Sequence, residues 1–138
     1  MTDTLHLEII TAGGAVVDTP AAQITLPLAD GEVGILPGHA PLLGALMCGV
    51  VRYTTAGMEH YCAVSPGTVN VAAGNVTVLA RTAERAPDID LARAEAALHR
   101  AESDLEARGM EMNISTPEAA RARAKARIRA VELWRKNG

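Results

Sequence analysis

The chain changes character near Pro87, and this change constrains the fold more than any other feature of the sequence. Before that point it is rich in Val, Thr, Ile and Gly, and it holds three Lys or Arg against seven Asp or Glu. Residues 88–138 are rich in Ala, Arg and Glu, and they hold ten basic and nine acidic side chains. Compositions of these two kinds favour strands and helices respectively. We therefore predict two domains, residues 1–87 and residues 88–138.

The first domain is expected to consist of short strands separated by tight turns. Apolar residues alternate with their neighbours at Leu5, Leu7 and Ile9, and again at Ile24 and Leu26. Further strands are predicted at residues 50–54, 58–64, 68–72 and 76–80. The pairs between them, Ala56-Gly57, Pro66-Gly67 and Gly74-Asn75, are typical of turns. Strands at such short spacing indicate antiparallel hairpins in a sandwich or barrel.

Residues 30–41 interrupt this pattern. The segment holds three Gly and two Pro, together with Val33, Ile35 and Leu36. We expect an ordered loop between strands that its apolar residues hold in place. Ordered loops on rigid scaffolds often carry binding residues.

The second domain is expected to form two helices. Asp88 is a candidate N-cap, and Gly109 is a candidate helix end. Leu91, Leu98, Leu105 and Met112 recur every seven residues and form a narrow apolar stripe with Ala94 and Ala101 between them. Thr116-Pro117-Glu118 is typical of a new helix start. The predicted apolar face of the first helix is this stripe, and that of the second helix is Ala120, Ala124, Ile128 and Val131.

Charge is divided between these two helices. Residues 88–111 carry a net charge of -4 and residues 117–138 a net charge of +5, so an antiparallel hairpin would bring opposite charges together. Its apolar stripes are mostly Ala, which makes the hairpin a candidate for a movable element. The predicted fold class is α+β, an N-terminal antiparallel β-sandwich followed by a C-terminal antiparallel α-helical hairpin.

Several functional classes lack support in the sequence. It contains no phosphate-binding loop, dinucleotide fingerprint or nucleophile elbow, and its four His residues lack metal-ligand spacing. Cys48 and Cys62 are interpreted as small apolar residues. Aromatic residues are scarce, the net charge is -3, and neither a membrane span nor a secretory signal is evident. We predict no catalytic residue, no metal site, no nucleic-acid partner and no membrane insertion, and a binding or coupling module in the cytoplasm.

The loop from Gly31 to Leu43, GEVGILPGHAPLL, resembles the signature of the epsilon subunit of bacterial F-type ATP synthases. The segment Gly74–Ala80 is similar to the same family, and the resemblance extends over essentially the whole chain. It implies a non-catalytic subunit of the rotary central stalk, peripheral to the cytoplasmic face of the plasma membrane. The implied partners are the gamma subunit and the ring of c subunits, and no cofactor is required.

The resemblance also implies roles for particular residues. Glu32 and His39 occupy loop positions that lie near the polar loops of the c ring in relatives. A solvated carboxylate remains the alternative for Glu32, and hydrogen bonding within the loop is favoured for His39.

In this family the hairpin lies folded beside the sandwich or extends toward the catalytic alpha and beta subunits, where it inhibits ATP hydrolysis. The basic second helix suits that role, and a solvated basic helix is the alternative. The residues concerned are Arg121, Arg123, Lys125, Arg127 and Arg129.

The segment Ile89–Ala94 fits the I-D-x-x-R-A pattern of relatives that bind ATP on the folded hairpin. ATP is accordingly the implied regulatory ligand, because guanidinium groups match phosphate oxygens. Salt bridges within the hairpin are the alternative. The implied ATP-binding residues are Glu84, Ile89, Asp90, Arg93, Arg100, Arg123 and Arg127.

Two other functions use the same residues. One is a free-standing nucleotide-sensing module, and the other, the weakest, is a nucleic-acid adaptor built on the basic last helix. Stable association with a gamma subunit would favour the stalk subunit over the first, and absence of salt-sensitive nucleic-acid binding would exclude the second.

Overall fold

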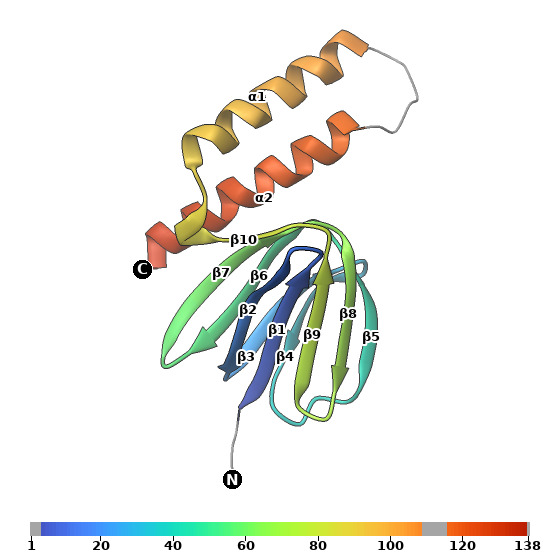
Figure 1. The fold of residues 1–138 in the computed structure, drawn as a ribbon, viewed down its shortest axis with the longest axis vertical. Helices are drawn as coiled ribbons and strands as arrows, with labels where there is room; N and C mark the ends of the chain where they lie inside the picture. The colour runs from blue at the N-terminus through green and yellow to red at the C-terminus, as the bar shows by residue number, and fades with distance from the viewer. Residues whose placement is uncertain (1–3, 109–115, 138) are drawn as a thin grey trace.

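The computed structural model describes residues 4–108 and 116–137, which form a β-sandwich and two helices (Figure 1). The predicted fold class is confirmed. The strands are β1 (Leu5–Thr11), β2 (Gly14–Ala21), β3 (Gln23–Leu28), β4 (Gly31–Ile35), β5 (Leu42–Leu46), β6 (Gly49–Thr55), β7 (Met58–Val64), β8 (Gly67–Ala72), β9 (Asn75–Ala80) and β10 (Ala83–Arg85). A short 3-10 helix, η1 (Ala86–Asp88), precedes helices α1 (Leu91–Arg108) and α2 (Thr116–Asn137).

The strands pair in the order β10-β7-β6-β3-β5-β8-β9-β1-β2, and β4 pairs with β3 beside this path. The two ends of the order meet, because β2 contacts both β6 and β10. One pair departs from the antiparallel prediction, since β1 runs parallel to β9. These strands lie far apart in the chain, so a long connection leaves room for parallel pairing.

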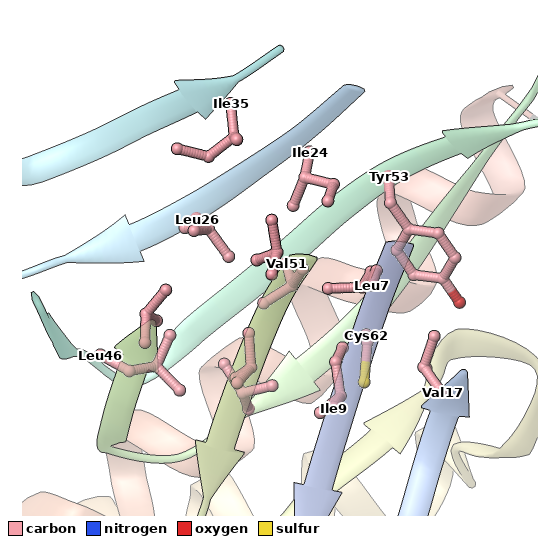
Figure 2. Close-up of a cluster of buried hydrophobic side chains, with 14 of the residues drawn as sticks. Leu7, Ile9, Val17, Ile24, Leu26, Ile35, Leu46, Val51, Tyr53 and Cys62 are labelled. Carbon is pink, nitrogen blue, oxygen red and sulfur yellow. The ribbon is translucent and has the colours of Figure 1, made fainter. Parts of the chain in front are cut away.

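The core lies inside the sandwich and consists of strand residues (Figure 2). The predicted alternation holds in β1, where Leu5, Leu7 and Ile9 are buried, and in β3, where Ile24 and Leu26 are buried. Because every second residue of a strand points to the same face, these side chains converge between the sheets.

The sequence missed β2, β5 and β10 and misassigned the segment 30–41. The segment is not one loop, because β4 occupies its first half and pairs with β3. Ile35 is buried and Val33 packs against the core, as expected, whereas Leu36 is exposed and does not hold the segment in place. Leu36 lies just past the end of β4, where the pairing that directs side chains inward has stopped.

Helix α2 covers the outer face of β6 and β7, and α1 packs antiparallel on α2 (Figure 1). The predicted positions Ala94, Ala101, Ala124 and Val131 are buried, while Ala120 and Ile128 are partly exposed. The stripe leucines of α1, Leu91, Leu98 and Leu105, are also only partly buried, and Met112 lies outside the described residues. A second stripe of α2, Ala126 and Ala130, packs against Val50, Tyr61 and Ala63 of the sheet. Alanine lets the helix approach the strands closely.

The N-cap prediction was wrong by two residues. Helix α1 begins at Leu91, and the Arg93 amide donates to Oδ1 of Asp90 at 3.1 Å, so Asp90 is the N-cap. Asp88 lies in η1, and the extended residue Ile89 separates it from the cap. The predicted helix end at Gly109 lies outside the described residues.

Candidate functional site

A pocket of about 600 Å³ lies at the base of the hairpin, between β10, η1, α1 and α2. Its walls come from two parts of the chain, the continuous stretch 84–100 and Arg127 of α2. The lining residues are Glu84, Asp88, Ile89, Asp90, Arg93, Ala94, Ala96, Ala97, Arg100 and Arg127. The fold thus brings together six of the seven residues that the sequence placed in an ATP site.

Three guanidinium groups reach this pocket from two helices. Arg93 and Arg100 lie two turns apart on α1, and Arg127 comes from α2. Nε of Arg127 donates to Oε1 of Glu84 at 2.6 Å, which ties α2 to the last strand of the sandwich. Guanidinium groups in this arrangement can bind the oxygens of a polyphosphate bidentately.

Three carboxylates face the same space and balance these charges. Glu84 is paired with Arg127, Asp90 caps α1, and Asp88 lies in η1. Among the described residues that line the pocket there is no Ser, Thr, Cys, His or Lys. Such a lining can bind and orient an anion through its guanidinium groups.

Arg123 is the predicted residue that does not line the pocket. It lies one helical turn before Arg127, and the charges of both arginines act on Cys48. Burial raises the pKa of the Cys48 thiol, and the two positive charges oppose this rise without cancelling it. Asp88 and the alanines of α1 were not among the site residues predicted from the sequence. The alanines lie beside Arg93 and Arg100, and this run of small residues was the signal that space is left for a ligand.

The five basic residues of α2 that the sequence analysis assigned to inhibition do not share one face in the folded hairpin. Nε of Arg121 lies 3.7 Å from Oε2 of Glu102, so opposite charges do meet across the hairpin, as predicted. Arg127 is held by Glu84. Lys125 and Arg129 are exposed beside a groove floored by Ala126 and Leu133.

Glu32 and His39 lie on β4 and in the turn after it. Nη2 of Arg52 donates to Oε1 of the exposed Glu32 at 2.9 Å. Nδ1 of His39 lies 2.6 Å from the Ala40 carbonyl oxygen, and the His39 amide donates to the Leu36 carbonyl at 3.0 Å. His39 therefore holds its turn by hydrogen bonds, as the sequence favoured.

The sequence did not identify an apolar patch on the outer face of the sheet. Leu43 of β5 is 80% exposed and Leu79 of β9 is 49% exposed. Ala45 pairs with Thr68 and Thr68 pairs with Leu79, so Leu43, Ala45 and Leu79 point to the same outer face, on two strands that flank β8. Exposed leucines grouped on a rigid sheet are typical of a protein interface.

No cluster of His, Cys, Asp and Glu within the two described ranges has the composition of a metal site. In the same ranges, neither helix is long and apolar enough to span a bilayer.

Together the fold and these sites define a class: a β-sandwich with a helical hairpin, an arginine-lined pocket at their junction and an apolar patch suited to a partner. Two family models match the chain. They are "ATP synthase, Delta/Epsilon chain, beta-sandwich domain" over residues 4–86 and "ATP synthase, Delta/Epsilon chain, long alpha-helix domain" over residues 88–132. The chain belongs to the ATP synthase delta/epsilon chain family, and the resemblance found in the sequence is confirmed.

Curated relatives match over most of their length. The chain is 42% identical over 132 residues to an ATP synthase epsilon chain of Desulforamulus reducens, covering 96% of this chain and 100% of the relative. It is 39% identical over 128 residues to the epsilon chain of Solibacter usitatus, covering 93% and 96%. It is 44% identical over 111 residues to that of Koribacter versatilis, covering 80% and 78%.

Solved structures show the same fold at lower identity. A chain of the Euglena gracilis mitochondrial ATP synthase, in an OSCP/F1/c-ring structure, aligns with a TM-score of 0.67 at 21% identity, over 99% of this chain and 82% of that one. A chain of the Tetrahymena thermophila mitochondrial ATP synthase, in a central stalk and c-ring structure, aligns with a TM-score of 0.54 at 17% identity, over 95% and 93%.

Proposed function

We propose that this chain is a non-catalytic subunit of the central stalk of an F-type ATP synthase, and that it couples rotation of the c ring to ATP synthesis. The observation that carries the proposal is the 42% identity to an epsilon chain over that relative's whole length, sandwich and hairpin included. Its place is at the cytoplasmic face of the plasma membrane, as a peripheral subunit.

The apolar patch around Leu43 and Leu79 is the surface we assign to the gamma subunit. The segment that carries Glu32 and His39 is assigned to the polar loops of the c ring. Apolar side chains on a rigid, flat sheet suit a permanent contact, whereas an exposed Glu32–Arg52 ion pair contributes orientation more than affinity.

Copurification tests this assignment. Leu43→Glu places a charge in the patch and is expected to abolish recovery of gamma with the tagged chain. Met58→Glu is the matched control, because Met58 is 61% exposed but is the first residue of β7, outside the patch. Equal recovery of gamma with Leu43→Glu and wild type would contradict the assignment, and it would leave a free-standing nucleotide-sensing module as the better reading.

The hairpin is proposed to inhibit ATP hydrolysis when it leaves the sandwich and extends toward the alpha and beta subunits. In the folded form, Arg121 and Arg127 are occupied by Glu102 and Glu84. Extension would free them, together with Arg123, Lys125 and Arg129, to meet an acidic segment of a catalytic beta subunit. Folding the hairpin therefore hides part of the charge that inhibition requires.

ATP is proposed to bind the pocket at the hairpin base and to favour the folded form. The phosphates would contact Arg93, Arg100 and Arg127, and Ile89, Asp90 and Glu84 would complete the site. A ligand that spans α1, α2 and β10 interacts only with the folded arrangement, so it shifts the population toward that state.

Calorimetric titration of ATP into the isolated chain tests this site. Wild type is expected to bind saturably, and Arg93→Ala and Arg127→Ala are each expected to weaken binding at least tenfold, as the loss of a charge-assisted contact predicts. Arg123→Ala is the control, because Arg123 lies outside the pocket. Absence of binding at millimolar ATP would contradict the nucleotide site and leave the stalk assignment standing.

A further inference from the structure

The three aromatic residues of the chain gather at one place, the C-terminal end of α2. Tyr53, Tyr61 and Trp134 line a single pocket of about 470 Å³, together with His60, Arg85 and Asn137. The ring of Tyr53 stacks on His60 with the centroids 5.2 Å apart. This pocket is distinct from the arginine-lined pocket, which it adjoins across the β10–η1 connection.

A hydrogen bond joins the last residue of α2 to the sheet beneath it. Nδ2 of Asn137 donates to the hydroxyl oxygen of Tyr61 at 2.8 Å, across 76 positions in the sequence. Tyr61 lies in β7 and is buried, whereas Trp134, one turn before Asn137, is 37% exposed. Because Tyr61 is fixed in a strand, its hydroxyl is a rigid acceptor for the helix end.

Helix α2 is thus tied to the sandwich by two polar contacts ten residues apart. The first is Arg127 on Glu84 and the second is Asn137 on Tyr61. Over the same part of the helix, Ala126, Ala130 and Leu133 supply the apolar contact. Alanine buries little surface, so the polar contacts carry an unusually large share of the attachment.

The two polar contacts lie in different surroundings. Glu84 and Arg127 line the proposed nucleotide pocket, but Tyr61, Trp134 and Asn137 do not. The C-terminal end of α2 lies against the sandwich beside β10, while its other end projects away from the sandwich (Figure 1). Helix ends fray before helix centres, so separation of α2 from the sheet would begin at this last turn.

We propose that Tyr61, Trp134 and Asn137 form a C-terminal latch, which fastens α2 to the sandwich independently of nucleotide and sets how readily the hairpin leaves the sheet. The contact itself is a property of the isolated chain. Only its consequence in the complex, control of the inhibitory extension, rests on the proposed function.

Native-state hydrogen exchange of the full chain without ATP tests the latch. Tyr61→Phe removes only the hydroxyl group and is expected to speed exchange of α2 amides about fivefold, the equivalent of a hydrogen bond worth about 1 kcal/mol. Amides of β1 and β9, on the far side of the core, keep their wild-type rates. Quenching of Trp134 fluorescence by acrylamide rises in the same variant, because the end of the helix separates from the sheet.

Two further variants make the result specific. Asn137→Ala removes the other partner and is expected to give the same increase, with no further increase when it is combined with Tyr61→Phe. Tyr53→Phe is the matched control, since Tyr53 lines the same pocket but the hydroxyl bonded to Asn137 belongs to Tyr61; its α2 exchange should match wild type.

The proposal would be overturned if the α2 amides exchanged at the wild-type rate in both Tyr61→Phe and Asn137→Ala. So would an equal increase in α2, β1 and β9, because the hydroxyl would then stabilise the sandwich as a whole. These measurements need neither ATP nor the other subunits, so failure of the proposed function would not change them.

Discussion

Gly67 occupies a position where no side chain fits. A Cβ atom at this residue would lie 1.8 Å from the Leu79 carbonyl oxygen, a contact with backbone that cannot move aside without breaking the β8–β9 pairing. Gly67→Ala is expected to lower the free energy of unfolding by about 3 kcal/mol or more, measured by urea denaturation.

Gly34→Ala is the matched control for this prediction. It also changes a strand glycine, but the added Cβ would meet no atom within 4 Å. Its effect should stay within about 0.5 kcal/mol. Equal stability of the two variants would show that the close approach at Gly67 is not a constraint.

Cys62 makes the stability of the sandwich depend on alkaline pH. Burial raises the pKa of its thiol from 9.0 to about 12, against an opposing effect of Arg85. Between these values the unfolded chain releases a proton that the folded chain retains, so stability falls as pH rises from 9 to 12. The loss attributable to this thiol reaches about 4 kcal/mol at the upper end.

Urea denaturation at several pH values checks the effect of Cys62. Cys62→Ala is expected to flatten the decline above pH 9. The half-buried Cys48 provides the comparison, and Cys48→Ala should keep most of the decline. Burial also raises the pKa of Tyr53 and Tyr61, so a residual slope is expected in both variants. An unchanged slope in Cys62→Ala would refute the assignment.

At the scale of elements, the start of α1 depends on one side chain. Asp90→Ala removes the acceptor of the Arg93 amide and is expected to cost about 1 kcal/mol of stability, seen as faster hydrogen exchange in the first turn of α1. Asp88→Ala changes a nearby carboxylate in η1 and should have less effect. If the two variants behave alike, Asp90 is not the cap.

The elements that the sequence predicted well are those with a clear period. Strands β1, β3, β6, β7, β8 and β9 alternate or are bounded by turn pairs. Strand β2 contains Asp18 and Pro20, which are tolerated because β2 lies at the end of the strand order. Strand β4 carries two glycines, and its pairing with β3 is tertiary information that no local pattern contains.

For the site too, the sequence predicted the part that a local pattern carries and not the part that depends on tertiary packing. The motif Ile89–Ala94 pointed to the hairpin base, and the fold brings Glu84 and Arg127 there from other elements. The position of Arg123 was not predictable, because helical spacing alone places it on the same side as Arg127. The actual outcome depends on how α2 is rotated on β6 and β7, which the stripe of Ala126 and Ala130 sets.

At the scale of the whole molecule, the sandwich and the hairpin are stabilised by different kinds of contact. The main core is made of strand residues, while the hairpin rests on the sheet through small side chains and a few polar contacts. Residues 1–87 therefore keep their core when the helices are removed, and the outer positions Val50, Tyr61, Ala63 and Ala86 become more exposed. A stable base with a weakly attached hairpin is what a two-state regulator requires.

The rate of ATP hydrolysis by a reconstituted complex is the most direct test of this account. Complexes assembled with the full chain are compared with complexes assembled with residues 1–87, after equal incorporation has been verified. We predict normal assembly and several-fold faster hydrolysis with residues 1–87, because the helix that we propose to be inhibitory is gone. Equal rates of hydrolysis in the two complexes would contradict the regulatory role of the hairpin.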